Sequence, residues 1–310
     1  MKISVVSSAY NEEENVEELY QRVKEQFDKL GKYEYEQIVV DNASTDGTAD
    51  KLREIAAKDK NFKVILNTRN FGHIRSPFYA ILQGSGDAVI YMVSDLQDPP
   101  ELIPQFIEKW EQGNKIVLAQ KTESEEGFFF SKVRKLYYKL LNMLNDSGAE
   151  LTKNCTGFGL YDKIVIQKFR DIEDPYPYAR GLVGEFGYQK ALIPFKQPLR
   201  KRGFTKNNFY TLYDNAMIGF INHSKVPLRL AVFLGFALAG FSFVIGCIYL
   251  VVKILWWDIF PAGTAPILIG VFFLGSLQLL FLGIIGEYVG MILTQVLKRP
   301  LVIEKERINF

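Results

Sequence analysis

Short apolar runs alternate with helical patterns through the first part of the chain. The run "KISVVSSAY" is typical of a strand that is buried on both faces, and "NEEENVEELYQRVKEQFDKL" follows it with helical spacing. The same order continues through "YEQIVVDNASTDGT", "ADKLREIAAK", "FKVILNT", "SPFYAILQGS" and "DAVIYMVS". Strands and helices that alternate at this length predict an α/β fold, in which right-handed crossovers join parallel strands of one sheet.

Polar residues follow each of the predicted strands. The four strand ends read "SSAYNE", "VVDNASTDGT", "LNTRNFGH" and "VSDLQDPP". Ligands of open α/β sheets bind beyond the carboxyl ends of the strands. We therefore expect the functional site at this edge.

The pattern changes after Gly127. Two amphipathic segments, "FFFSKVRKLYYKLLNMLN" and "NNFYTLYDNAMIGFIN", have apolar residues at helical spacing. Such helices usually face a core, but the second leads directly into an apolar run, so a position at a membrane surface is the alternative. No charged residue occurs at positions 230–252 or 259–286. Each run exceeds the roughly 20 residues that cross a bilayer, and we prefer two membrane spans to two buried core helices.

Charge places the ends of these runs. Lys225 and Arg229 precede the first run, and Lys298 and Arg299 follow the second, so the positive-inside rule predicts that both termini are cytoplasmic. The net charge of +2 favours no nucleic acid partner, and Cys247 lies inside the first run, so a disulfide framework is excluded. The predicted units are a cytoplasmic domain at 1–205, interfacial helices at 206–229, membrane spans at 230–252 and 266–288, an extracytoplasmic loop at 253–265, and a cytoplasmic tail at 289–310.

The stretch "SDLQDPPE" is a candidate metal site. Asp95 and Gln97 point to the same side if the strand continues to them. A carboxylate beside an amide oxygen suits a hard divalent cation that also contacts phosphates. The alternative is helix capping, in which Asp98 caps "PPELIPQFIEKW" with Pro99 at its first position.

Two further motifs each have two interpretations. An acid at the end of "VVDNASTDGT" accepts hydrogen bonds from a base or ribose, or belongs to a plain turn. The basic residues of "PLRKRGFTKNN" attract anionic lipid headgroups or hold phosphates. His73 and His223 are isolated, and the sequence contains no Ser–His–Asp pattern, P-loop or G-x-G-x-x-G.

A resemblance connects these motifs. In their order and spacing, "SAYNEEEN", "VVDNASTDGT", "SDLQDPPEL" and "RGFTKNNF" resemble family 2 glycosyltransferases of GT-A fold. With "VPLRL", "GEYVG" and "KRPLVIE", the chain resembles polyprenyl-phosphate glycosyltransferases, which are relatives of dolichol-phosphate mannose synthase and include the bactoprenol glucosyltransferases. The resemblance implies a GT-A Rossmann-like, mostly parallel sheet, followed by interfacial helices and two transmembrane helices.

The resemblance also implies a reaction in the cell membrane. A nucleotide sugar, with UDP-glucose or UDP-GlcNAc as the expected donor, gives its sugar to undecaprenyl phosphate at the cytoplasmic face. The product is a lipid-linked monosaccharide for cell-envelope glycosylation. A non-catalytic membrane scaffold that keeps the fold, or a transferase with a different acceptor, is the alternative. Relatives of this type are oligomers, and a homotetramer is favoured.

Matched position by position, the resemblance implies roles for individual residues. Mg²⁺ or Mn²⁺ is expected on Asp95 and Gln97. The implied catalytic residues are Asp95, Arg200 and Lys206. The implied contacts of the lipid phosphate are Arg200, Arg202 and Lys206. The implied nucleotide contacts are Ser8, Tyr10, Glu12, Asp41, Ser94, Asp95 and Lys121.

This sequence departs from the family pattern at four positions. Ser8 replaces the usual proline, and Val93 replaces the first acid of D-x-D. Gly157 and Gly159 stand where an acid and an arginine are common. The missing acid does not abolish the chemistry, because a phosphate acceptor, with a second pKa of about 6, needs no base. The reaction then requires positioning and neutralisation of the departing charge.

The tail "LVIEKERINF" is too apolar to be fully solvated. We expect it to form a strand that pairs with a sheet edge, either its own or that of another protomer. The oligomeric relatives favour the other protomer.

Overall fold

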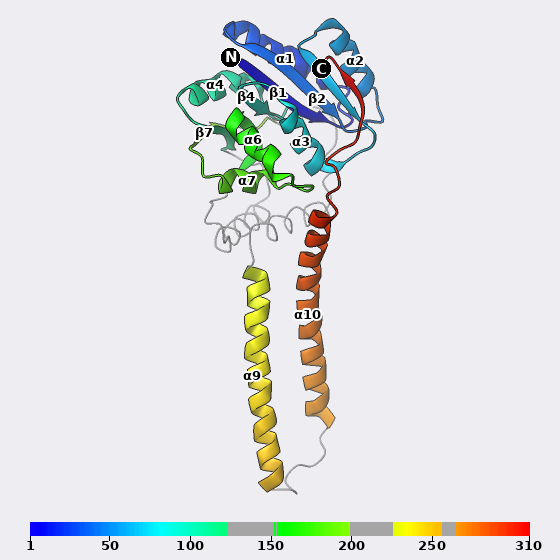
Figure 1. The fold of residues 1–310 in the computed structure, drawn as a ribbon, viewed down its shortest axis with the longest axis vertical. Helices are drawn as coiled ribbons and strands as arrows, with labels where there is room; N and C mark the ends of the chain where they lie inside the picture. Colours follow the sequence, from blue (N-terminus) through cyan, green and yellow to red (C-terminus); the bar gives the residue numbers. More distant parts are fainter. Residues whose placement is uncertain (123–151, 153, 199–225, 256–263) are drawn as a thin grey trace.

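The computed structural model describes residues 1–122, 152, 154–198, 226–255 and 264–310 (Figure 1). The strands are β1 Lys2–Ala9, β2 Glu34–Asp41, β3 Phe62–Asn67, β4 Ala88–Tyr91, β5 Ile116–Lys121, β6 Cys155–Asp162, β7 Lys190–Phe195 and β8 Glu304–Ile308. The α-helices are α1 Val16–Leu30, α2 Thr48–Lys58, α3 Gly72–Gln83, α4 Ile103–Glu111, α6 Lys163–Ile172, α7 Ala179–Glu185, α9 Val226–Leu255 and α10 Thr264–Val296, and a 3₁₀ turn, η1, covers Pro100–Leu102.

The described strands form one sheet in the order β7-β5-β6-β4-β1-β2-β3-β8. The strands β1, β2, β3 and β4 are parallel, which confirms the sheet predicted from the alternating pattern. The strand β6 runs antiparallel to both β4 and β5, and β8 runs antiparallel to β3. The fold is therefore a mixed α/β sheet in which most strands point the same way.

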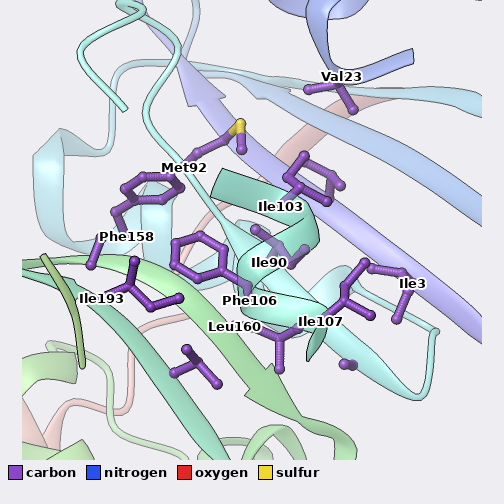
Figure 2. Packing of buried hydrophobic residues seen from close by; sticks show 14 of the residues in the cluster. Ile3, Val23, Ile90, Met92, Ile103, Phe106, Ile107, Phe158, Leu160 and Ile193 are labelled. Carbon is purple, nitrogen blue, oxygen red and sulfur yellow. The ribbon is translucent and has the colours of Figure 1, made fainter. Parts of the chain in front are cut away.

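Helices cover both faces of the sheet. On one face, α1 and α4 pack over β1 and β4 through Val23, Phe106 and their neighbours (Figure 2). The helix α2 continues this layer over β2 and β3, where Leu52 is fully buried. On the opposite face, α3, α6 and α7 cover the sheet, with Phe78 and Phe169 in edge contact at a centroid distance of 5.3 Å. Burial of large apolar side chains on both faces supplies the main driving force for folding.

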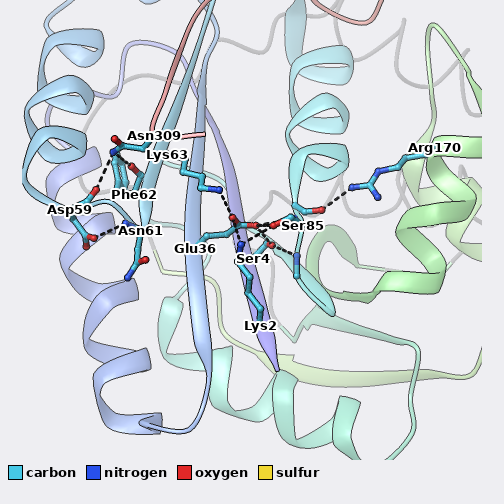
Figure 3. Close-up of polar contacts among 12 residues, drawn as sticks. Lys2, Ser4, Glu36, Asp59, Asn61, Phe62, Lys63, Ser85, Arg170 and Asn309 are labelled. Atoms are coloured by element: carbon cyan, nitrogen blue, oxygen red, sulfur yellow. Dashed lines mark hydrogen bonds and ion pairs between the residues drawn. The ribbon is translucent and has the colours of Figure 1, made fainter.

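The amino edge of the sheet contains a buried carboxylate that is held by ion pairs and hydrogen bonds (Figure 3). The carboxylate of Glu36 on β2 forms ion pairs with the ammonium groups of Lys2 and Lys63, at 2.7 and 2.8 Å. It also accepts the hydroxyl of Ser4 at 2.6 Å and the backbone N–H of Ser85 at 2.9 Å. These bonds outweigh the cost of burial and lower the pKa of Glu36 to about 2. The cluster joins β1, β2, β3 and the turn before β4.

Two long apolar helices, α9 and α10, project from the α/β domain (Figure 1). Among the described residues, the stretch Phe273–Val296 is long and apolar enough to cross a membrane by length and composition, and Leu228–Ser242 is a shorter apolar stretch. The first expected span is therefore not confirmed by this criterion. Both helices extend beyond the spans expected from the absence of charge, since α10 continues to Val296.

The C-terminal tail forms a strand, as expected, but the expected partner is wrong. β8 pairs antiparallel with β3 of the same chain, in the register Val64↔Ile308 and Ile65↔Arg307. The side-chain amide of Asn309 donates to the carbonyls of Ala56 and Phe62, at 2.7 and 2.8 Å. The apolar composition of the tail predicts a strand but carries no information about its partner. The homo-oligomer stays a prediction.

Several predicted residues lie outside the part of the chain that the structure describes. They are Arg200, Arg202, Lys206, the amphipathic segments before α9 up to position 225, and the loop at 256–263.

Candidate functional site

The carboxyl edge of the sheet has unusual backbone conformations. Asn11, Ala43 and Leu96, which follow β1, β2 and β4, have φ angles of 56°, 59° and 62°. Residues other than glycine seldom adopt this left-handed region, which costs free energy, and such positions concentrate at functional sites. Strain at three neighbouring strand ends therefore marks the edge at which the sequence predicts a ligand.

Asp41, a predicted nucleoside contact, lies at the end of β2 and is 2% exposed. Its carboxylate accepts the backbone N–H of Ser44 at 3.1 Å and the Ser44 hydroxyl. Burial raises the pKa of Asp41 in spite of these bonds. The carboxylate thus organises the turn that contains Ala43, so the turn interpretation holds, while contact with a nucleoside stays a prediction.

Asn42 connects this turn to the loop after β3, a role that sequence reasoning missed. Its Oδ1 accepts the backbone N–H of Phe71 at 2.9 Å, and its Nδ2 donates to Oδ1 of Asn70 at 2.9 Å. Asn67 at the end of β3 joins the same network at 3.3 Å. The asparagines in "DNAST" and "LNTRN" could have indicated this role, since asparagine side chains often hydrogen-bond to the backbone of turns.

Tyr10 and Glu12 follow β1. Tyr10 is half-buried, and Glu12 is 9% exposed. The Glu12 carboxylate accepts the side-chain amide of Asn15 at 2.6 Å, and its backbone N–H donates to the hydroxyl of Thr48 at 2.9 Å. The structure brings both residues to the predicted edge and gives Glu12 a local bonding role there.

Ser8 and Ser94 join the ends of β1 and β4. The Ser94 hydroxyl donates to the carbonyl of Ser8 at 3.0 Å, and the Ser8 side chain hydrogen-bonds to Tyr91. The serine that replaces the family's proline thus contributes a side-chain hydrogen bond that proline cannot make.

Asp95 and Gln97 lie in a turn, so the strand alternation expected for them is wrong. β4 ends at Tyr91, and Leu96 between them is left-handed. The backbone N–H of Gln97 donates to Oδ1 of Asp95 at 3.1 Å, which is an Asx-type turn. Asp95 is half-buried at the sheet edge. Within the described residues, no group of three or more histidine, cysteine, aspartate or glutamate side chains could hold a metal.

Asp98 does not cap the following helix. η1 begins at Pro100, its N-cap is Pro99, and no side chain caps it. Asp98 is instead 1% exposed and accepts the backbone N–H of Val93 at 3.0 Å. Burial raises the pKa of Asp98 to about 7, and the Asp95 carboxylate adds to the rise.

Two cations oppose that rise. Lys121 at the end of β5 and Arg180 on α7 both lower the pKa of Asp98 through their charge. Lys121 was predicted from the resemblance, whereas Arg180 was not, because nothing in the pattern of its helix distinguishes it from a solvated arginine. Asp95, Asp98, Lys121 and Arg180 thus form one electrostatic group.

Gly157 and Gly159 on β6 are built into the backbone of this site. Gly157 has a φ of 97°, which disfavours any side chain. A Cβ atom on Gly159 would lie 2.2 Å from the carbonyl oxygen of Val117 on β5. An arginine at position 159 would therefore require a shift of β6 against β5, and an acid at position 157 would require a strained backbone conformation.

The sequence is related to known glycosyltransferases. The family model for "Glycosyl transferase family 2" matches residues 4–172. The chain is 33% identical over 307 residues to the SfII prophage-derived bactoprenol glucosyl transferase of Shigella flexneri, and the match covers 99% of this chain and 98% of the relative. It is 31% identical over 307 residues to the putative glycosyltransferase CsbB of Bacillus subtilis, with 98% and 91% covered.

Solved structures resemble the chain less closely. One is the Mycobacterium tuberculosis glucosyl-3-phosphoglycerate synthase in complex with UDP, at 20% identity and a TM-score of 0.47, with 71% of this chain and 78% of that chain covered. Another is S. aureus TarS 1–349 with UDP-GlcNAc, at 18% identity and a TM-score of 0.43, with 72% and 67% covered.

Proposed function

Because this chain belongs to glycosyl transferase family 2, we propose that it transfers a sugar from a nucleotide sugar to undecaprenyl phosphate at the cytoplasmic face of the cell membrane. UDP-glucose and UDP-GlcNAc are the proposed donors. The observation that carries the proposal is the match with bactoprenol glucosyl transferases, which spans the α/β domain, α9, α10 and the tail together. A lipid acceptor gives the apolar helices a purpose that a soluble acceptor would not.

The transfer requires no general base on the protein. The second pKa of a phosphate monoester is about 6, so the acceptor is largely a dianion at neutral pH. One of its oxygens attacks the anomeric carbon of the sugar, and the bond from that carbon to the diphosphate breaks, so the nucleoside diphosphate leaves with the electron pair. The protein must align the two substrates and balance the negative charge that develops on the leaving group.

The cations beside Asp98 suit that second task. Lys121 and Arg180 lie in the electrostatic group at the carboxyl edge, where a donor diphosphate is proposed to bind. Arg180 compensates for the arginine that is common in the family where this chain has Gly159. Arg200 and Lys206 are proposed to add further phosphate contacts, and Lys206→Ala or Arg200→Ala should reduce turnover more than Lys225→Ala.

A divalent metal fits the residues present. GT-A enzymes commonly use one, and Mg²⁺ is often held by one or two carboxylates together with substrate phosphates and water. Asp95, with one oxygen held by the Gln97 backbone, would supply one carboxylate, and Gln97 would supply an amide oxygen. When bound, Mg²⁺ or Mn²⁺ would neutralise charge on the diphosphate. Val93 in place of an acid leaves more ligand positions to the phosphates.

The proposal includes the arrangement in the membrane. α9 and α10 are proposed to form two spans with both termini in the cytoplasm, which places the carboxyl edge of the sheet beside the headgroups that carry the acceptor. The run of apolar residues in α9 and the basic residues at both outer ends support this topology.

Membranes that contain the full chain test the function directly. Radiolabelled UDP-glucose and UDP-GlcNAc are supplied with undecaprenyl phosphate and either Mg²⁺, Mn²⁺ or a chelator, and the organic extract is assayed for labelled lipid. A metal-dependent labelled product is expected from one donor. A folded protein that labels no lipid with any nucleotide sugar would favour the non-catalytic scaffold, for which Val93 and Gly157 are the motivating residues.

A further inference from the structure

A group of arginines lies where α10 ends and the α/β domain begins. Arg69 follows β3, Arg75 is in the first turn of α3, and Arg299 comes shortly after α10. The chain after α10 reaches the domain at this point, because Nη2 of Arg75 donates a hydrogen bond to the carbonyl of Pro300. Two parts of the chain that are distant in the sequence, the stretch after β3 and the stretch after α10, thus place their guanidinium groups together.

Phe71 holds two of these side chains in position. The Arg69 guanidinium carbon lies 4.1 Å from the centroid of the Phe71 ring, and that of Arg75 lies 5.3 Å from it. The ring itself is 6% exposed. Stacking on an anchored ring orders the guanidinium groups before any ligand arrives.

The loop that contains Arg69 and Phe71 is also anchored through its backbone. Asn42, at the end of β2, accepts the N–H of Phe71 and donates to Asn70. The arginine cluster therefore belongs to the carboxyl edge of the sheet, on the β3 side, away from the group that contains Asp95.

The positive charge of the cluster is not compensated within the described part of the chain. No described carboxylate forms an ion pair with Arg69, Arg75 or Arg299, and Nε of Arg75 is buried without a hydrogen-bond partner. Burial lowers the pKa of Arg75, and the charges of Arg69 and Arg299 lower it further, while only Tyr176 opposes them. Like charges held together in a partly desolvated place favour an anionic ligand.

The surroundings indicate which anion. In the last turns of α10, Leu293 and Val296 are 57% and 70% exposed, so an apolar surface leads directly up to the arginines. Acyl chains would cover that surface, and a phosphate at the top of the same lipid would meet the guanidinium groups. Arginine suits phosphate because its planar group donates two parallel hydrogen bonds.

We propose that Arg69, Arg75 and Arg299 bind the phosphate of an anionic phospholipid headgroup in the bilayer and thereby fix the α/β domain against the membrane. The proposal rests on the membrane position of α10 that is part of the proposed function. It goes beyond sugar transfer, because the lipid here is a structural ligand and not a substrate. The Arg75 bond to Pro300 makes the tail part of the same anchoring point.

Native mass spectrometry of the full chain in detergent micelles tests this site. Phosphatidylglycerol and phosphatidylcholine are titrated separately, and the lipid-bound fraction is measured. We expect tighter binding of phosphatidylglycerol, weakened about fivefold by Arg69→Gln and by Arg299→Gln, and about 25-fold by both together. These two substitutions leave the hydrogen bond from Arg75 to Pro300 intact, and thermal unfolding checks that the variants fold. Lys58→Gln, which removes an exposed charge from α2, is the matched control and should change nothing.

The outcomes separate the possible sources of the phosphate. Unchanged phosphatidylglycerol binding in the double variant, or equal binding of both phospholipids by the unaltered chain, would overturn the proposal. A variant that loses undecaprenyl phosphate binding but keeps phosphatidylglycerol would also overturn it, since the cluster would then serve the acceptor. If the unaltered chain binds phosphatidylglycerol through these arginines but transfers no sugar, the headgroup site stands and only the proposed function fails.

Discussion

Two acids buried at opposite edges of the sheet have pKa values that are shifted in opposite directions. At the amino edge, Glu36 is surrounded by two lysines and by hydroxyl and N–H donors, and its pKa is lowered to about 2 (Figure 3). At the carboxyl edge, Asp98 is equally buried but accepts a hydrogen bond from the backbone N–H of Val93, and its pKa is raised to about 7. The carboxylate at one edge forms direct ion pairs with two lysines, whereas the carboxyl group at the other edge has one backbone hydrogen bond and the through-space charges of Lys121 and Arg180.

Backbone geometry follows the same division in part. The left-handed residues Asn11, Ala43 and Leu96 lie at the carboxyl edge, whereas Asn309, which bonds to Phe62 at the start of β3, is left-handed at the amino edge. A protein can hold strain at one edge when the packed structure around that edge leaves the backbone no alternative conformation. The comparison teaches that the sheet gains stability from the Glu36 cluster at its amino end, whereas strained backbone and a carboxyl group of raised pKa lie at its carboxyl end, where the proposed chemistry would take place.

The largest expected effect is on activity at the carboxyl edge. Asp95→Asn should lower transfer between about 10²- and 10³-fold, equal to about 3–4 kcal/mol, because it removes charge aimed at the metal and diphosphate. Lipid-linked sugar formation is measured across a metal titration. The matched variant is Asp87→Asn, which changes an acid at the amino edge that accepts the N–H of Lys2. Equal turnover by Asp95→Asn and the unaltered chain would remove Asp95 from the mechanism.

The next effect is on stability at the amino edge. Glu36→Gln should lower the free energy of unfolding by about 3 kcal/mol, because it leaves Lys2 and Lys63 without their counter-ion. Denaturant titration provides the measurement, and turnover per folded molecule should stay the same. Glu34→Gln, at an exposed position on the same strand, serves as the control. A loss of turnover with no loss of stability would contradict the claim that the amino edge serves stability and not activity.

The same carboxylate predicts how stability depends on pH. The pKa of Glu36 in the folded chain is about 2, below its ordinary value of 4.5, so its contribution is complete above pH 4.5 and is lost as the pH falls toward 2. The loss should approach about 3 kcal/mol, because each pKa unit corresponds to about 1.36 kcal/mol. Unfolding curves at pH 6 and pH 3 should differ by about 2 kcal/mol of this loss, because Glu36 in the folded chain is still mostly ionised at pH 3. Glu36→Gln should flatten this dependence, and an equally steep dependence in the variant would assign it to other acids.

The smallest effect is expected at the lateral edge, where β8 pairs with β3. Asn309→Ala should lower stability by about 1 kcal/mol, because the lost amide hydrogen bonds are replaced in part by water. Hydrogen exchange of the β3 and β8 amides reports this change locally. Lys305→Ala, at an exposed position of β8, is the control. Equal exchange in both variants would mean that pairing of the strands alone holds the tail.

The sequence predicts the elements of the carboxyl edge better than their geometry. The positions of β1, β2 and β3 follow from short apolar runs with polar ends, and Asp41, Ser94 and Lys121 lie at that edge as the resemblance implied. Asp95 shows the limit. A continuous apolar run does not reveal that β4 stops at Tyr91, because the left-handed turn at Leu96 is held by bonds that Asp95 and Asp98 make to the backbone.

The contacts between residues that are distant in the sequence could not be predicted, for a different reason. Asp98 had the pattern of a helix cap, but burial and the Val93 N–H decide its role. Arg180 reaches the site only because α7 packs against β6, and no local signal encodes that packing. β8 was predicted as a strand from its composition, but the choice of β3 as partner depends on where α10 delivers the tail.

Because β8 pairs with β3, the sheet is completed only when the end of the chain has been synthesised. Arg53 and its ion-pair partner Glu306 are 253 residues apart, so the ribosome completes nearly the whole chain before the sheet can close. Until then, β3 is an open edge strand that can pair with other nascent chains. α9 and α10 are made before β8, so the edge closes only after the hydrophobic helices have left the ribosome. The last residues translated thus cover the open edge of β3.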